Sequence, residues 1–333
     1  MSSTADVAAA RATKARGSGR RSGITMKVVS TVLGAVGTVL AASFVIFVAL
    51  SFAPGDPVAQ LLGSKATDEA RAATSAKLGL DDPLLVRYWD WLSAALHGDF
   101  GTSFTYRTDV IELIKPRLET TFLLVAMAAV LMLVVGIGLG TIGGVSRRWR
   151  PVVSALAGLG ISIPTFVAAS VLISVFAVQL GWFPTFGAGE GLADQVEHLV
   201  LPAVALSISY GAYVTQLSSA AVRDEAGKEY VMTSRGRGIP SRRILRRHVL
   251  RNAALPVMTA SGLAIAGLVA GAVVVEQAFA IDGIGSLLIS SISNKDYPIV
   301  IAVSLVIVVV FVVVTTIIDV AQVLLDPRQR GDR

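Results

Sequence analysis

The side chains that most often perform chemistry are scarce in this sequence. The three histidines, His97, His198 and His248, lie far apart in the chain, so they do not form the close set of ligands that a metal site requires. The chain has no cysteine, which excludes disulfides, thiolate metal ligands and a cysteine nucleophile. The sequence therefore predicts no catalytic residue and no metal site.

One glycine-rich stretch has the spacing of a cofactor-binding loop. Residues 138–143 read Gly-Leu-Gly-Thr-Ile-Gly, the dinucleotide-binding pattern. That loop must follow a strand and face a soluble pocket, whereas this stretch lies inside an apolar segment. Gly136, Gly140 and Gly144 fall four residues apart, which favours close packing between helices. The phosphate-binding sequence GxxxxGK[ST] is absent, so the chain is not expected to hold ATP by that motif.

A few uncharged polar side chains interrupt the apolar segments. Polar groups at membrane depth often mark a translocation pathway, but they also form hydrogen bonds between helices. Both interpretations stay open for these five residues: Ser162, Thr165, Tyr210, Tyr213 and Gln216.

Six long apolar blocks must position these residues. The chain of 333 residues is 53% hydrophobic and only 16% charged, against about 25% charged in soluble domains. Each block has the length of about 20 residues that a bilayer requires, and none contains Asp, Glu, Lys, Arg or His. We therefore predict an all-α integral membrane protein with six transmembrane helices, at residues 28–52, 121–145, 152–180, 199–222, 253–275 and 299–318.

The absence of charged residues from the six apolar blocks indicates which energy source could drive transport. An ion-coupled carrier normally has a carboxylate at mid-depth, and an ion channel has charged rings or a filter loop. Neither is visible, which favours a passive scaffold driven by a separate ATPase. An ion-coupled secondary carrier and a purely structural subunit remain alternatives.

The charges between the blocks predict the orientation. Basic residues dominate the N-terminal tail and every second connection, while the other connections are acidic. By the positive-inside rule we expect both termini in the cytoplasm, with the chain in the plasma membrane. The first block, at 25 residues, exceeds the 7–15 residues of a signal peptide, so we interpret it as a retained anchor. Because the basic residues follow the topology, no nucleic acid partner is expected.

The expected organisation follows from these segments. Residues 1–25 form a disordered basic tail, 26–52 the first transmembrane helix, 53–120 an extracytoplasmic helical segment, 121–325 a five-helix core, and 326–333 a cytoplasmic tail. Within 53–120, Thr67 and Asp82 are expected to cap short helices. Val110, Leu113, Ile114 and Leu118 predict a helix that lies on the membrane and is interrupted at Pro116.

The cytoplasmic loop 223–252 has a regular pattern. Residues 229–235 favour a helix, Gly236 and Gly238 interrupt it, and Ser241 can cap a second helix over 242–250. In that second helix Ile244, Leu245 and Val249 face the protein or membrane. Such a helix–bend–helix suits docking into a groove of a soluble partner, and its arginines equally suit an anchor to anionic lipids.

Several spaced motifs resemble one family of ABC importers. Residues 230–239 (Tyr-Val-Met-Thr-Ser-Arg-Gly-Arg-Gly-Ile) and 247–253 are similar to the cytoplasmic coupling loop of its permeases, with Met232, Thr233 and Ser234 where the general signature has Glu-Ala-Ala. Further similar stretches are Ala-Pro-Gly-Asp-Pro at 53–57, Gly-Asp-Phe-Gly-Thr-Ser at 98–103, Glu-Gln-Ala-Phe at 276–279, Gly-Ile-Gly at 283–285 and Asp-Tyr-Pro at 296–298. The chain thus resembles B-type permeases of the dipeptide/oligopeptide/nickel importer family over residues 26–330.

The resemblance implies a type I ABC importer permease arrangement and a set of partners. These are a homologous second permease subunit, two ATPase domains that hold ATP and Mg, and an extracytoplasmic substrate-binding protein that contacts segments 53–120 and 276–298. Di- or oligopeptides are the implied substrates, with nickel chelates, glutathione or haem as alternatives within the family. The implied coupling residues are Met232, Thr233, Ser234, Arg235, Gly236, Arg237, Gly238, Ile239, Pro240 and Ser241.

Overall fold

A computed structural model describes residues 3–53, 57–63, 66–77 and 79–325, with side chains from residue 26 onward. Over these residues the fold is helical, and the only pairing of extended backbone is an isolated antiparallel bridge between Thr102 and Asp109. The all-α prediction is confirmed. The predicted tail 326–333 lies outside the described residues.

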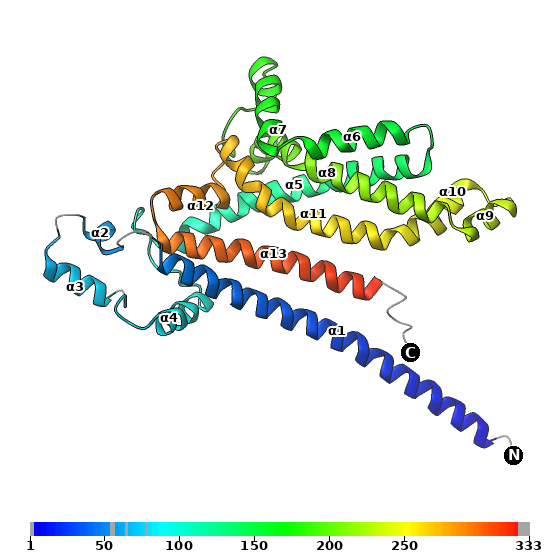
Figure 1. Cartoon of the computed structure of the whole chain (residues 1–333), viewed down its shortest axis with the longest axis horizontal. Helices are drawn as coiled ribbons and strands as arrows, with labels where there is room; N and C mark the ends of the chain where they lie inside the picture. Colours follow the sequence, from blue (N-terminus) through cyan, green and yellow to red (C-terminus); the bar gives the residue numbers. More distant parts are fainter. Residues whose placement is uncertain (1–2, 54–56, 64–65, 78, 326–333) are drawn as a thin grey trace.

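Long helices run side by side along the longest axis of the molecule (Figure 1). α5 packs along α8, α8 along α11, α11 along α13, and α13 along α1. Each of the five contains an apolar stretch long enough to cross a bilayer. Their bounds are α1 (Ser3–Ser51), α5 (Val110–Val145), α8 (Leu192–Ala226), α11 (Leu250–Ala278) and α13 (Tyr297–Leu325).

The third predicted span is broken. α6 (Arg150–Ser162) and the helix formed by α7 (Thr165–Leu172) with the π-helical η1 (Ile173–Gln179) meet at 97°. The break falls at Ile163 and Pro164, because a residue before proline is pushed out of the helical region and Ile163 has an extended ψ of 116°. The described residues therefore contain five continuous candidate spans, or six if the bent pair counts as one.

α1 differs from the prediction at its beginning. The candidate span covers Met26–Ser51, but the helix itself already starts at Ser3 and includes residues 3–25, which we predicted to be disordered. The segment is rich in alanine and arginine, which are strong helix formers. A helix over residues 3–25 is therefore compatible with the composition of this segment.

The start of α5 also differs from the prediction. Residues 110–118 do not lie on the membrane as a separate helix; α5 runs unbroken through Pro116. Val110 and Ile114 are buried in a cluster with Ile284, Leu287 and Ile299. This packing fixes the first turns of α5 in the bundle and overrides the helix-breaking tendency of the proline.

Short helices gather around the Ser51 end of α1 (Figure 1). Thr67 caps α3 (Asp68–Lys77) as predicted, since its Oγ1 accepts a hydrogen bond of 3.3 Å from the Ala70 amide. Asp82 does not cap α4 (Leu84–Leu96), because Pro83 is the N-cap residue of that helix. The short helices are α2 (Pro57–Leu62), α3 (Asp68–Lys77), α4 (Leu84–Leu96) and, between α11 and α13, α12 (Ile284–Ser293).

The main core lies where α5, α8 and α11 meet. Leu124 and Met132 of α5, Leu206 of α8 and Leu268 of α11 are fully buried there. This core fixes the long helices relative to one another, so the loops at either end are held by a rigid bundle.

Candidate functional site

Two short helices project from one end of the bundle, where α8 ends and α11 begins (Figure 1). They are α9 (Glu229–Gly236) and α10 (Ser241–Ile244), and α10 continues through the π-helical η2 (Leu245–Val249) into α11. The predicted helix–bend–helix is therefore present. Pro240, not Ser241, is the cap residue of α10.

The bend between α9 and α10 has the geometry of a glycine-terminated helix. Gly238 has a φ of +74°, a conformation that side chains with a Cβ rarely adopt. Its amide bonds the Arg235 carbonyl at 2.9 Å, and the Ile239 amide bonds the Ser234 carbonyl at 3.2 Å. These two bonds form a Schellman motif, which ends α9 and reverses the chain.

The inner side of this unit is apolar and packed. Val231, Ile244 and Val249 are buried against Val222 of α8 and Ala253 of α11, with Ile239 and Leu245 beside them. The predicted inward orientation of Ile244, Leu245 and Val249 is confirmed. A force applied to α9 or α10 is thus passed directly to two long helices.

A polar network, which the sequence did not reveal, fixes the same unit. Glu225, near the end of α8, bonds the Tyr230 hydroxyl of α9 and pairs with Lys228 at 2.5 Å. Asn252 of α11 donates to the Tyr230 hydroxyl at 3.0 Å. Burial raises the pKa of the Tyr230 phenol above its ordinary value, and the Glu225 carboxylate raises it further. Tyr230 therefore stays a neutral donor that joins three helices.

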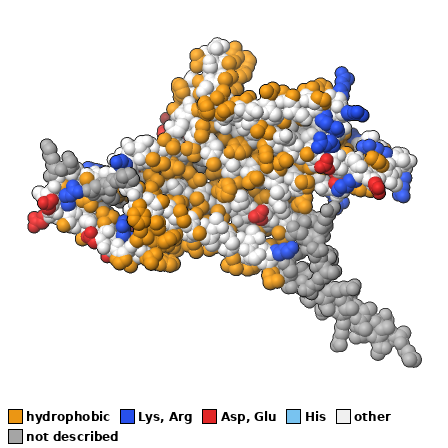
Figure 2. Space-filling view, viewed as in Figure 1, with side chains coloured by type: hydrophobic (Ala, Val, Ile, Leu, Met, Phe, Trp, Pro, Cys, Tyr) orange, Lys and Arg blue, Asp and Glu red, His pale blue; other side chains and the backbone are white. Residues whose placement is uncertain are grey.

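The outer side of the unit is open. Met232 is 59% exposed, and among the ten residues 232–241 only Ser234 and Ile239 are half-buried. We call these ten residues the 232–241 surface. Lys and Arg side chains gather at this end of the molecule (Figure 2). The arrangement suits contact with a soluble partner through an exposed, rigidly backed edge.

The five residues predicted for a pathway have different local partners in the structure. The Tyr210 hydroxyl donates to the Gly267 carbonyl at 2.7 Å, so this side chain joins α8 to α11. Tyr213 is half-buried against the main core. Ser162 bonds the Gly158 carbonyl of its own helix, and Thr165 begins α7 beyond the break. Gln216 borders a cavity of about 190 Å³, with Ser154, Ser219 and Arg223 in its wall.

The three spaced glycines lie against α8. A Cβ on Gly140 would come within 2.5 Å of the Ser218 Cβ, one on Gly144 within 2.7 Å of Val222, and one on Gly136 within 2.9 Å of Val214. The absence of side chains therefore sets the close approach of α5 and α8. Among the described residues, no three His, Asp or Glu side chains form a group that could hold a metal ion.

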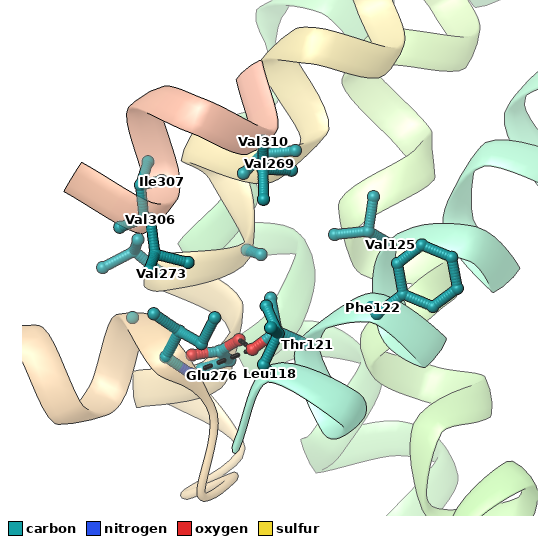
Figure 3. Close-up of a pocket in the computed structure, with 13 residues that line it drawn as sticks. Leu118, Thr121, Phe122, Val125, Val269, Val273, Glu276, Val306, Ile307 and Val310 are labelled. Carbon is teal, nitrogen blue, oxygen red and sulfur yellow. Dashed lines mark hydrogen bonds between the residues drawn. The ribbon is translucent and has the colours of Figure 1, made fainter. Parts of the chain in front are cut away.

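Glu276 is a residue whose role the sequence did not indicate. We assigned it to the loop 276–298, but it lies in α11 and is fully buried. Its carboxylate accepts a hydrogen bond from the Thr121 hydroxyl at 2.6 Å (Figure 3) and another from the Ser286 amide at 3.0 Å. The Thr121 hydroxyl oxygen in turn accepts from the Ile284 amide at 2.9 Å. The carboxylate thus ties the first turn of α12 to α5 and α11.

Glycines make room for this carboxylate. A Cβ on Gly283 would lie 2.1 Å from the Glu276 carboxyl carbon, and one on Gly285 would lie 2.5 Å from the Val273 Cα. A small apolar cavity of about 50 Å³ adjoins the carboxylate and is lined by Val125, Val269 and Val306, among others (Figure 3). The Gly-Ile-Gly stretch therefore serves close packing around a buried acid.

A second buried acid holds the segment 99–109. Asp296, just before α13, accepts bonds from the Ser103 hydroxyl at 2.6 Å and from the amides of Phe104 and Thr105 at 3.2 and 2.9 Å. Asp296 and Glu276 are both buried, so of the acids in the loop predicted to contact a binding protein only Asp282 is exposed. Each acid stands in a motif that is similar to the family, so the sequence marked its position. The motif did not reveal the role of the acid, because its hydrogen-bond partners are distant in the sequence.

Comparisons with known proteins agree over most of the chain. Residues 136–331 match the family described as binding-protein-dependent transport system inner membrane component, and residues 25–125 match its N-terminal counterpart.

Curated relatives are similar over nearly their full length. The chain is 36% identical over 291 residues to an oligopeptide transport system permease of Bacillus subtilis, covering 85% of this chain and 92% of the relative. It is 34% identical over 294 residues to a probable peptide ABC transporter permease of Sinorhizobium fredii, covering 86% and 93%. It is 33% identical over 305 residues to a glutathione transport system permease of Escherichia coli, covering 91% and 98%.

A solved structure shares the fold of the core. The MetNI methionine ABC transporter, in an inward-facing conformation, matches with a TM-score of 0.52 and 18% identity. The match covers 63% of this chain and 96% of that chain.

Proposed function

Because this chain belongs to the family of binding-protein-dependent transport system inner membrane components, we propose that it forms half of the translocation pathway of an ATP-driven importer of di- or oligopeptides. It is a multi-pass protein of the inner membrane and a membrane subunit of a transport complex. Its work is mechanical: it binds no nucleotide itself, and ATP and Mg are held by partner ATPase subunits.

One observation carries the proposal. The 232–241 surface is exposed, while the other side of α9 and α10 is packed on Val222 and Ala253 and linked by hydrogen bonds through Tyr230 to α8 and α11. A partner that moves this surface would move both long helices, because α9, α10 and η2 are packed on α8 and α11. In the proposed cycle, closure of two ATPases displaces the surface and turns the bundle from inward-facing to outward-facing.

The other partners follow from the family. Its description names a binding protein, and we propose an extracytoplasmic substrate-binding protein that contacts the exposed parts of segment 53–120 and residues 292–295. A homologous second permease would complete the pathway. Both termini would lie in the cytoplasm, in keeping with the basic charge of the tail and of the loop 223–252.

Support for a peptide substrate comes from the relatives. Two of them are described as peptide or oligopeptide permeases, and a third, at 33% identity, as a glutathione permease. Glutathione is itself a tripeptide, so it is the second candidate. Gln216 is the pathway residue with the best support, because it borders a cavity that also contains polar side chains.

One observation bears on the alternative of an ion-coupled carrier, namely that the carboxylate of Glu276 is buried. A proton relay needs a carboxylate at mid-depth with a free acceptor site. Glu276 lies only two residues before the end of α11, and both of its oxygens already accept hydrogen bonds. This geometry favours a structural role for the carboxylate.

The test is affinity purification of the tagged chain from its own cells in mild detergent. The proposal expects an ATPase and a second permease in near-equal amounts, and their loss when residues 235–241 are replaced by a flexible linker. A milder variant, Met232→Asp, keeps the fold because the side chain is exposed, and should also release the ATPase. Leu192→Asp changes an equally exposed apolar residue at the start of α8 and is the matched control. A chain that purifies folded and without an ATPase would refute the proposal.

A further inference from the structure

The helix α4 is held against α1 by hydrogen bonds and aromatic contacts. The Tyr88 hydroxyl lies 2.8 Å from the Ser43 hydroxyl and donates to the Leu40 carbonyl at 3.3 Å. The Tyr88 ring lies against Phe44 and Phe47, with centroids 5.1 and 5.7 Å apart. These contacts fix the position of α4 along the length of α1.

That position lies inside the membrane span. Ser43 is eight residues before the end of the candidate span Met26–Ser51, or about 12 Å at 1.5 Å per residue. A span of 26 residues is about 39 Å long, which exceeds the hydrocarbon thickness of about 30 Å by only about 4–5 Å at each end. The Tyr88 hydroxyl is therefore about 7 Å below the hydrocarbon surface, within the depth of about 5–10 Å at which interfacial helices lie.

The outward side of α4 is apolar as well. Tyr88 and Leu92 are buried, but the neighbouring stripe of Leu85, Trp89 and Leu96 is 60%, 64% and 78% exposed. At 100° per residue these three side chains fall within about 40° of one another, while Asp90 lies about 120° from the centre of the stripe and is exposed. Figure 2 shows hydrophobic side chains gathered over the region of α4.

The stripe continues the lipid-facing surface of the first span. Leu40, Phe44 and Val45 of α1, at the same level, are exposed although they lie within the span. A helix fixed beside them at this depth is surrounded by the same medium.

We propose that α4 is a half-inserted interfacial helix, whose Leu85, Trp89 and Leu96 enter the acyl chains of the leaflet at the Ser51 end of α1. The inference does not depend on which side of the membrane that leaflet faces, nor on the substrate. Its consequence is that the segment 53–120 is anchored in the bilayer and does not move freely in water.

The natural absence of cysteine allows a direct test. Single cysteines are placed at Trp89, Leu96 or Asp90 of the full chain, labelled with a nitroxide and reconstituted in phosphatidylcholine–phosphatidylglycerol vesicles. Collisions with oxygen, which concentrates in acyl chains, are compared with collisions with a water-soluble nickel chelate. We expect a several-fold higher oxygen-to-nickel ratio at 89 and 96 than at 90.

Two outcomes would overturn the proposal. High nickel accessibility at all three positions would place α4 in water, and low accessibility of 89 and 96 to both reagents would mean that protein covers the stripe. The unlabelled chain gives a second measurement that does not rely on cysteine variants. Lipids brominated near the top of the acyl chain should quench the tryptophan fluorescence, and Trp89→Phe should remove a strongly quenched component; an unchanged quenching profile would contradict insertion.

Discussion

Ser103 donates a hydrogen bond of 2.6 Å to Asp296, although 193 residues separate them in the chain. Both side chains are buried, and the amides of Phe104 and Thr105 complete the environment of the carboxylate. The contact joins two stretches, Gly-Asp-Phe-Gly-Thr-Ser and Asp-Tyr-Pro, that were each similar to the family for no visible reason. Their common role is to fasten the segment before α5 to the start of α13.

Asp296→Ala should lower the stability of the protein in detergent. The substitution leaves the Ser103 hydroxyl and two amides without their buried acceptor, and each unsatisfied group costs about 1–3 kcal/mol. Thermal unfolding should therefore show a clearly lower midpoint. Asp282→Ala removes an exposed acid from the same region and should leave the midpoint unchanged. Equal midpoints for the two variants would show that the Asp296 contacts contribute nothing.

Gly283→Ala should destabilise the protein through Glu276. Gly283 has a φ of −107°, which alanine accepts, so the cost comes from the new Cβ at 2.1 Å from the carboxyl carbon. Overpacking of this kind typically costs about 1–3 kcal/mol.

A double-mutant cycle with Glu276→Ala tests the origin of that cost. Removing the carboxylate also removes the clash, so the double variant should lose less stability than the sum of the single losses. Additive losses would mean that Gly283 acts through some other contact.

Gly140→Ala should weaken the packing of α5 on α8. Its Cβ would approach the Ser218 Cβ to 2.5 Å and the Thr215 carbonyl to 2.9 Å, for an expected loss of about 1–3 kcal/mol. Gly138→Ala, two residues away, meets nothing within 4 Å and should gain up to about 1 kcal/mol from helix propensity. The two variants should shift the thermal midpoint in opposite directions; a shared direction would argue against the helix contact.

The prolines show what the sequence could and could not predict about the fold. The apolar blocks are a strong signal, because a bilayer requires length and excludes charge. Yet Pro116, Pro202 and Pro256 lie inside continuous helices, and only Pro164 accompanies a 97° break. Whether a proline breaks a helix depends on the packing of its neighbours, which the local sequence does not contain.

The candidate site was predictable to a similar extent. The bend at Gly238 and the inward side chains of α10 and η2 follow from local signals, namely glycine and the spacing of apolar residues. The buried acids Glu225, Glu276 and Asp296 do not, because an acid at the end of an apolar block is expected to face water. Their partners Thr121 and Ser103 are distant in sequence, so only the tertiary structure reveals why these acids are buried.

Gly238→Ala tests the shape of the 232–241 surface. Gly238 has a φ of +74°, and alanine in this left-handed conformation costs about 1–2 kcal/mol, so the bend should open or shift while the bundle stays folded. If the surface couples to an ATPase as proposed, the purified complex should keep its basal ATP hydrolysis but lose most of the stimulation by substrate. Gly236→Ala is the matched control, since Gly236 ends α9 with an ordinary φ and a Cβ there meets nothing within 4 Å. Stimulation that survives in Gly238→Ala as fully as in Gly236→Ala would show that the geometry of this bend does not carry the coupling.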